Sequence, residues 1–296
     1  MFKSILKWAA IGLMLAALAF FVVSPALAEV VTLPLEGTGF PPVPEGFLSD
    51  SEYQDDSIYV SIEKVKASGV ECMIARIVIA DPSQLRTAMS DNRYDKTVYV
   101  KALTMSKAAN AVISMNGDFF KYHNYGYLVR QGELYRERPN GEHDVLLIDN
   151  LGDFHVVQNG TEETVKAFLD ELPEELSIVN SFNFGPLLVK DGETVPITTT
   201  MYQYRYPMQR LAIVQYGDLE YAIVHCNGKH DATAGMTLAR FGEFIAEQIP
   251  EARIAYNLDG GGSAHVIFNN KVQHKTPDAR NICDILYFAS AVTPQE

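Results

Sequence analysis

Apolar runs joined by short, glycine-containing turns are the feature that most limits how this chain can fold. The runs joined by such turns are 127–130 with 133–135, 187–190 with 193–195, and 211–215 with 221–226. A further pair, 264–268 with 272–274, is joined by Asn269-Asn270-Lys271. Asp-Gly between two apolar runs is a strong hairpin signal, because glycine readily adopts the positive φ that tight hairpin turns require. The pattern predicts an α+β fold with a largely antiparallel sheet, rather than alternating helices and parallel strands.

Helices are expected to be few beside these hairpins. Alternation or continuous apolar character predicts further strands at 57–65, 70–80, 111–114, 253–258 and 282–291. Helical composition or spacing predicts helices at 82–89, 97–109, 161–172 and 237–249. With 296 residues, 47% of them hydrophobic, the chain can bury one sizeable core. No internal repeat divides it, so we expect a single catalytic domain over 57–296.

The first 28 residues have the pattern of a secretory signal peptide. Lys3 and Lys7 precede an apolar run over residues 8–23, and Ala26 and Ala28 occupy the small-residue positions of a cleavage site. We therefore expect a secreted or cell-envelope protein that begins at residue 29. The alternative is an uncleaved membrane anchor over residues 8–23, although this run is slightly short for a spanning helix.

Residues 29–56 are rich in proline and glycine and predict an extended leader or linker. The chain as a whole is acidic. Its net charge is −13, from 24 Lys and Arg against 37 Asp and Glu. A nucleic-acid-binding surface is therefore not expected, because phosphate backbones require a basic face. An anionic ligand must be bound locally, where a few arginines converge.

The three cysteines indicate neither a metal site nor a disulfide framework. Cys72 and Cys226 lie in apolar runs, where buried free cysteines also occur, and we favour that interpretation over a disulfide. No Cys–His spacing resembles a metal site. We expect no cofactor. An acidic cluster can hold a divalent cation, but the sequence shows no spacing of ligands for one.

The most informative motif is Asn257-Leu258-Asp259-Gly260-Gly261-Gly262-Ser263. An acid ends a buried strand and is followed by three glycines, which cost conformational entropy and suit a backbone that approaches a ligand. Successive backbone N–H groups in such a loop can bind an anion. The structural alternative is a tight turn between strands with Asp259 as its cap.

A second motif, Asn116-Gly117-Asp118-Phe119-Phe120, also follows a buried strand. By itself it fits a turn anchored by two core phenylalanines equally well. Arginines lie beside glycine turns or strand starts at Arg130, Arg210 and Arg280. Each is an ordinary surface residue unless the fold brings others to it.

Several segments, taken in order, resemble the phosphodiester glycosidase family. They are Asn116–Phe120, Phe184–Gly192, Arg210 with its strand, Gly235–Leu238, Leu258–Ser263 and Arg280-Asn281. Asp-Gly-Gly-Gly-Ser with the downstream arginine is the most specific part of the resemblance. The chain departs from the family at Gln209, where proline is frequent, and at Ala264-His265, where small hydroxyl residues are usual. The resemblance implies one α+β catalytic domain and glycosyl-phosphodiester substrates.

The chemistry of such substrates fits these residues independently. A phosphate monoester has a second pKa of about 6 and is a good leaving group, so the reaction needs a carboxylate at the oxocarbenium-like centre and cations on the phosphate. Asp118 and Asp259 are the expected catalytic acids. The expected substrate-binding residues are Asn116, Arg210, Gly260, Gly261, Gly262, Ser263, His265 and Arg280. Among them, the arginines and glycine N–H groups bind phosphate, Ser263 donates a hydrogen bond, and Asn116 and His265 line the sugar pocket.

The sequence thus predicts an exported glycoside hydrolase that acts on phosphorylated glycan. One alternative is a non-catalytic module that binds phosphorylated polysaccharide on the same scaffold. Another is a serine esterase with Ser263 as nucleophile, although Gly-Gly-Gly-Ser lacks the Gly-x-Ser-x-Gly pattern of hydrolase nucleophiles.

Overall fold

The computed structural model describes residues 29–94, 98–197, 204–229, 234–274, 276 and 279–294. The expected signal peptide at residues 1–28 lies outside them. Among the described residues, no helix has the length and apolar character needed to cross a membrane.

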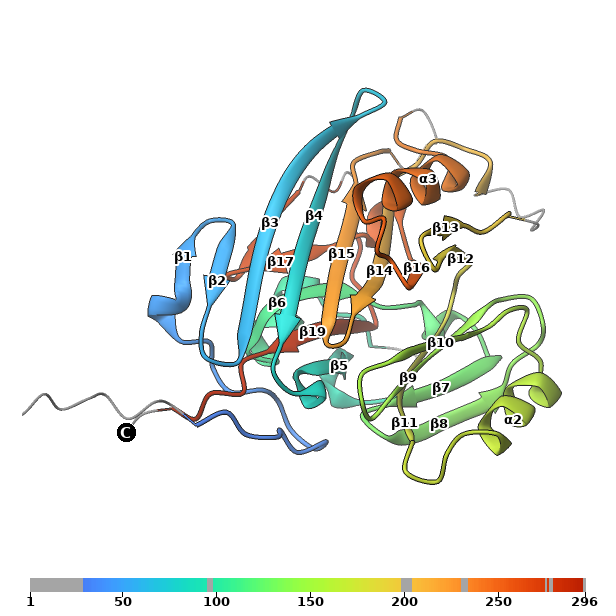
Figure 1. Cartoon of the computed structure of the whole chain (residues 1–296), viewed down its shortest axis with the longest axis horizontal. Coiled ribbons are helices and arrows are strands. Elements are labelled where there is room, and N and C mark those ends of the chain that lie inside the picture. The colour runs from blue at the N-terminus through green and yellow to red at the C-terminus, as the bar shows by residue number, and fades with distance from the viewer. Residues whose placement is uncertain are drawn as a thin grey trace, which may run out of the picture.

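The elements of the fold are mainly strands (Figure 1). The α-helices are α1 (Ala102–Ala108), α2 (Glu162–Asp170) and α3 (Leu238–Gln248). The strands of the first half are β1 (Phe47–Ser49), β2 (Glu52–Gln54), β3 (Ile58–Ala67), β4 (Val70–Ile79), β5 (Leu85–Met89), β6 (Ala111–Asn116), β7 (Gly126–Arg130), β8 (Glu133–Arg138) and β9 (Val145–Asp149). Those that follow are β10 (Phe154–Val157), β11 (Ile178–Asn183), β12 (Leu187–Lys190), β13 (Glu193–Thr194), β14 (Arg210–Gly217), β15 (Glu220–Cys226), β16 (Ile254–Leu258), β17 (Val266–Phe268), β18 (Lys271–Val272) and β19 (Asp284–Ala289).

Two sheets packed face to face form the body of the molecule. Within the described chain, the larger sheet has nine strands in the order β1-β2-β3-β4-β15-β14-β16-β12-β13, and the smaller has five in the order β18-β17-β6-β19-β5. The pairings in both are antiparallel, for example β4 with β15 and β6 with β19. The prediction of an α+β fold with a largely antiparallel sheet is confirmed.

The main core lies between these sheets. Ile77 and Ile213 of the larger sheet belong to one buried cluster with Met115, Phe268 and Leu286 of the smaller sheet. Helices cover the outer faces. α3 packs on the larger sheet, and α1, with part of the N-terminal segment, packs on the smaller one. This layering holds the ends of β6, β14, β16 and β19 in a rigid frame.

A smaller β lobe is attached to this body. It contains the hairpin of β7 and β8, the sheet β10-β9-β11 and α2, at the lower right of Figure 1. Thr161 caps α2 by accepting a hydrogen bond from the Thr164 N–H. Side chains of β11 join the two groups of strands, because the Ser181 hydroxyl accepts the Val129 N–H at 2.8 Å.

The segment expected to be an extended leader packs against the domain instead. Val30 and Phe40 form bridges with Val292 and Ser290, near the C-terminus, and Leu33 is buried. β2 pairs with β3 and extends the larger sheet. Proline and glycine do interrupt regular structure here, but the apolar side chains between them still bury themselves.

Two predicted helices are wrong in extent or type. Residues 82–89 form one 3₁₀ turn (Pro82–Gln84) followed by β5. Asp81 caps that turn, so the helix-start signal is real, but pairing of β5 with β19 then fixes the chain as a strand. Of the helix expected over 97–109, only α1 forms. Val100 forms a bridge with Ile282 instead, and Thr97 lies outside the described residues.

The interpretation of Cys72 and Cys226 as free core cysteines is also wrong. They form a disulfide. The two residues are register partners on the neighbouring strands β4 and β15, a relation that apolar character alone cannot reveal. Cys283 is free and buried.

Candidate active site

The expected site residues gather where the chain passes between the two sheets. Asn116 ends β6, Arg210 begins β14, and Asp259 directly follows β16. Leu258 pairs with Leu211, so the end of β16 lies beside the start of β14. From Asp259 the chain leaves the larger sheet and enters β17 of the smaller one. The Asp-Gly-Gly-Gly-Ser motif is therefore the loop that links the sheets.

Close backbone packing explains the glycines of this loop. A Cβ atom on Gly260 would lie 2.5 Å from the Gln209 carbonyl oxygen, and Gly261 has a φ of +54°. The Gly261 N–H donates to the Gln209 carbonyl at 3.1 Å, and the Ser263 N–H donates to that of Gly260 at 3.1 Å. Of the three glycine N–H groups expected to bind an anion, that of Gly261 is therefore already used within the fold.

Asn116 and His265 hold the ends of this loop rather than line a cavity for sugar. The Asn116 amide donates to the Asp259 carbonyl at 2.9 Å and accepts the His265 N–H at 2.9 Å. The His265 ring bonds through Nδ1 to the carbonyl of Ser263 at 2.7 Å. Both side chains thus fix the backbone that carries Asp259.

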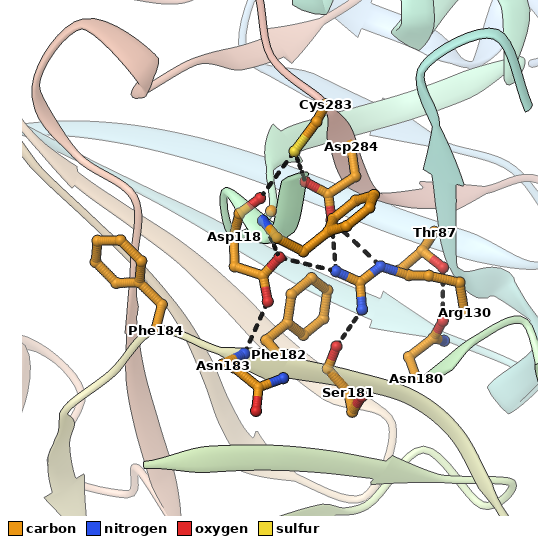
Figure 2. Close-up of polar contacts among 12 residues, drawn as sticks. Thr87, Asp118, Arg130, Asn180, Ser181, Phe182, Asn183, Phe184, Cys283 and Asp284 are labelled. Carbon is orange, nitrogen blue, oxygen red and sulfur yellow. Dashed lines mark hydrogen bonds and ion pairs between the residues drawn. The ribbon is translucent and has the colours of Figure 1, made fainter. Parts of the chain in front are cut away.

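Asp118 lies in a buried network and is 3% exposed (Figure 2). One carboxylate oxygen accepts from Arg130 at 3.1 Å and from the Phe120 N–H at 3.2 Å, and the other accepts the Asn183 N–H at 2.7 Å. These bonds link β6 to the smaller lobe. A carboxylate held by three donors is well placed to orient its surroundings.

Arg130 joins Asp118 to Asp284 at the start of β19. Its guanidinium donates to one oxygen of Asp284 at 2.6 and 3.2 Å, donates to the Ser181 carbonyl, and lies 4.4 Å from the ring centre of Phe182. Burial nevertheless raises the pKa of Asp284 to about 7, although Arg130 opposes the rise. This is because a buried charge loses its hydration.

The glycine in Asn116-Gly117-Asp118 leaves room for this network. A Cβ atom on Gly117 would lie 2.4 Å from a carboxylate oxygen of Asp284. Its N–H donates to the Asp284 carbonyl at 3.2 Å. The second motif therefore serves a buried ion-pair network, which the sequence did not predict.

Asp259 faces a cavity of about 430 Å³, within the usual size range of small-molecule sites. Asp259, Gly260 and Gly261 line it together with Arg210 and Arg280. Asp118 and Ser263 instead face a space of about 10 Å³ that Asp259 also borders. The structure thus brings Asp259 and both expected arginines to one cavity, and places Asp118 behind it.

The carboxyl group of Asp259 is electrostatically perturbed. Burial raises its pKa to about 6, and the charge of Asp118 adds to the rise. The Ser263 hydroxyl and the Arg280 guanidinium favour the ionised form and oppose the shift. A pKa near the working pH in a cavity is typical of groups that react. At pH 7 the group is still mainly a carboxylate.

The two arginines differ in how they are held. Arg210 is almost buried and donates to the carbonyls of Met236 and Tyr206 at 3.0 and 2.9 Å. Its burial lowers the pKa to about 10, so it stays protonated at neutral pH. Arg280 is exposed and makes no ion pair within the described ranges, but its N–H donates to the Gly262 carbonyl at 2.9 Å. The Arg210 guanidinium is thus held by backbone carbonyls, whereas Arg280 is exposed to solvent at the same cavity.

Comparison with known proteins identifies the family of this chain. The family model for phosphodiester glycosidases matches residues 109–289, more than half of the chain. The chain belongs to the phosphodiester glycosidase family. It is accordingly a hydrolase that acts on glycosyl bonds, and the resemblance noted in the sequence is confirmed. No curated protein sequence matches it.

Solved structures share the fold of this phosphodiester glycosidase at low identity. The catalytic domain of zebrafish N-acetylglucosamine-1-phosphodiester alpha-N-acetylglucosaminidase, auto-inhibited by its pro-peptide, has a TM-score of 0.62 at 16% identity and covers 88% of this chain and 98% of its own. A hypothetical protein from Synechocystis has a TM-score of 0.54 at 14% identity, covering 78% and 62%. A Burkholderia pseudomallei protein described as exported has a TM-score of 0.50 at 13% identity, covering 75% and 74%.

Three residues of the glycosidase cavity were missed in the sequence. Gln209, Asn257 and His123 line it, and each has a buried polar atom without a hydrogen-bond partner in the described chain: Gln209 Nε2, Asn257 Oδ1 and His123 Nε2. An unsatisfied buried polar group costs about 1–3 kcal/mol. Asn257 begins the glycine-rich motif and Gln209 precedes Arg210, so their position was the available signal. Nothing in the sequence marks His123.

The described part of the chain also has no cluster of side chains that could bind a metal ion. Among the described residues of this glycosidase, no group of three or more His, Cys, Asp or Glu side chains is arranged to hold an ion.

Proposed function

We propose that this glycosidase cleaves the bond between the anomeric carbon of a sugar and the phosphate of a glycosyl-1-phosphodiester. The observation that carries the proposal is the shared cavity, in which the Asp259 carboxylate faces the same space as the guanidinium groups of Arg210 and Arg280. A plain glycoside offers nothing for two arginines to bind, whereas a phosphodiester carries an anion next to the reacting carbon.

The role of each residue in the reaction follows from its position in the cavity. Arg210 and Arg280 bind the phosphate and stabilise the charge that develops on it as the bond from the anomeric carbon to oxygen breaks. Asp259 acts at the anomeric carbon rather than at the phosphate, either as nucleophile or as base for water. The products are the free sugar and a phosphate monoester, whose low pKa removes most of the need for a general acid.

Asp118 has a positioning role in this proposal. Its carboxylate oxygens are occupied by Arg130 and two backbone N–H groups, and it does not line the larger cavity. Its negative charge raises the pKa of Asp259. It therefore keeps Asp259 basic and fixes the end of β6, while Asp259 meets the substrate.

The serine esterase alternative gains no support from the geometry. The His265 ring bonds to the backbone carbonyl of Ser263 rather than to its hydroxyl, so His265 does not serve as its base. The hydroxyl instead acts on Asp259 and lowers its pKa. A binding module is less consistent with the site, because an ionised Asp259 beside the phosphate opposes anion binding and helps only in catalysis.

A hydrolysis screen tests the proposal. We expect the wild-type protein to hydrolyse methyl diesters of sugar-1-phosphates much faster than 4-nitrophenyl glycosides or sugar phosphomonoesters. Asp259→Asn should lower kcat by about 100-fold or more with an unchanged melting temperature, because the amide retains shape but cannot supply an electron pair to carbon or water. Near-wild-type turnover in Asp259→Asn would remove this residue from the mechanism.

Export to the cell envelope or the medium, where phosphorylated glycan is available, is part of the same proposal. The signal-like residues 1–28 support it, and a structural neighbour is described as exported. The disulfide between Cys72 and Cys226 is compatible with an oxidising compartment. N-terminal sequencing of protein from the envelope or medium should find Glu29 first. Intact Met1 in a membrane pellet would instead indicate an anchor over residues 8–23.

A further inference from the structure

Gln209, Asn257 and His123 present polar atoms that the fold leaves unused inside the candidate active site. Gln209 and Asn257 are 1% and 2% exposed, so water does not readily compensate them. Buried polar groups in folded proteins almost always have partners, and an exception in a cavity calls for a ligand. All three residues belong to the cavity that holds Asp259.

Asn257 shows which kind of partner is missing. Its amide nitrogen donates to the Gly185 carbonyl at 2.7 Å, which fixes the orientation of the amide and leaves Oδ1 as the unused atom. Asn257 lies on β16, two residues before Asp259, which directly follows that strand, and both residues line the cavity. Oδ1 therefore offers an acceptor beside the reactive carboxylate, where a hydroxyl or N–H must approach.

The backbone of Gln209 is hydrogen-bonded, whereas its side-chain nitrogen has no partner in the described chain. Its carbonyl oxygen accepts from Gly261, which ties it to the glycine loop. Within the described part of the chain its buried Nε2 has no acceptor. Gln209 directly precedes Arg210, the residue that is expected to bind the phosphate.

His123 differs from the second histidine of the cavity. The His143 ring uses both nitrogens, one with the Phe184 carbonyl and one with the Tyr125 hydroxyl, each at 3.1 Å. His123 has an unused Nε2 and lies against Phe119, with ring centres 4.6 Å apart. Burial and the neighbouring His143 lower its pKa, so the ring is neutral at pH 7.

We infer that Gln209, Asn257 and His123 form the sugar-binding part of the cavity and select a neutral sugar through its hydroxyl or amide groups. This rests on the proposed function, which places the anomeric carbon at Asp259. The three side chains supply donors and acceptors but no positive charge. A carboxylate on the sugar would lose its hydration there without gaining a cation, and would face the acceptor of Asn257. Uronic-acid-type sugars are therefore excluded.

The decisive variant is Gln209→Leu, because its effects on binding and stability differ in direction. Replacing a buried amide whose nitrogen has no partner by an apolar group of similar shape should leave the melting temperature unchanged or raise it. The same change should weaken binding of a neutral sugar roughly five- to tenfold, the typical effect of one lost hydrogen bond. A purely structural glutamine would behave in the opposite way.

Gln215, on the strand β14 that directly follows Gln209, supplies a matched control. Its amide is fully used, since it accepts the Phe154 N–H at 2.9 Å and donates to Asp153 at 2.8 Å. Gln215→Leu should therefore lower the melting temperature and leave sugar binding by the folded protein unchanged.

Binding is measured by ligand-observed NMR with free glucose, galactose, mannose, N-acetylglucosamine and glucuronate, and hydrolysis with the methyl diesters of their 1-phosphates. We expect binding of at least one neutral sugar, exclusion of glucuronate, and loss of affinity in Gln209→Leu with unchanged inhibition by dimethyl phosphate. Failure of every diester to react, with these binding results intact, would overturn only the proposed function. Unchanged sugar affinity in Gln209→Leu, no binding of any neutral sugar, or preferred binding of glucuronate would overturn the inference.

Discussion

At the scale of single residues, the account depends on the different surroundings of two aspartates. Asp118 accepts three hydrogen bonds and is closed off from the larger cavity, whereas Asp259 faces that cavity with a raised pKa. The sequence presented both as acids that follow a buried strand. Only the arrangement of Arg130 and Asp284 separates the positioning carboxylate from the reacting one.

The raised pKa of Asp259 predicts an acid limb in the pH profile. Because the reacting form is the carboxylate, kcat/KM for a glycosyl phosphodiester should fall about tenfold per pH unit below pH 6. Ser263→Ala should move this limb to higher pH, since the hydroxyl lowers the pKa of Asp259. A profile measured from pH 4 to 8 checks both. A limb near pH 4, or one that Ser263→Ala moves downward, would contradict the assignment.

At the scale of elements, local signals predicted most hairpins and two helix starts. The turns at Gln131-Gly132 and Asp191-Gly192 were recognised because their residues carry the necessary φ angles locally. The prediction of a helix over Pro82–Met89 was wrong because β5 becomes a strand by pairing with β19, which lies far along the chain. The prediction that Cys72 and Cys226 are free was wrong for the same reason, since only the pairing of β4 with β15 brings the two residues together.

The site, like the fold, was predicted only in part from the sequence. Asp259, Arg210 and Arg280 lie in recognisable motifs, and the fold does bring them to one cavity. Asn116 and His265 were assigned to the wrong task, because a motif shows which residues gather but not which atoms are already hydrogen-bonded. Residues such as His123 became visible only through the atoms that the fold leaves unsatisfied.

At the scale of the whole molecule, the buried network of Asp118, Arg130 and Asp284 ties the smaller lobe to the body. It should also make stability depend on pH. Burial raises the pKa of Asp284 from its ordinary value of 3.8 to about 7, so the folded protein favours the protonated form. Its stabilising contribution is complete below about pH 4 and is lost as the pH rises through 7.

Asp284→Asn removes that titration. The melting temperature of the wild-type protein should therefore fall more steeply between pH 4 and 7 than that of Asp284→Asn, whatever their difference at a single pH. Thermal unfolding in matched buffers measures both curves. Parallel curves would show that Asp284 is ionised throughout this range and that Arg130 outweighs the effect of burial.

The charge of the whole molecule leads to the most direct test of the central claim. A chain with a net charge of −13 repels anions at long range, so the phosphate must be recognised by the cavity itself. Arg280 is the exposed cation at that cavity. The measurement is kcat/KM of wild type and Arg280→Ala for a sugar-1-phosphate methyl diester and for the 4-nitrophenyl glycoside of the same sugar. We expect a loss of roughly 1.5–3 kcal/mol on the diester, the range for a hydrogen bond to a charged group, with a much smaller loss on the neutral glycoside. Arg280→Lys should restore little, because a point charge does not replace the planar guanidinium. Equal losses on the two substrates would contradict phosphate recognition by this cavity.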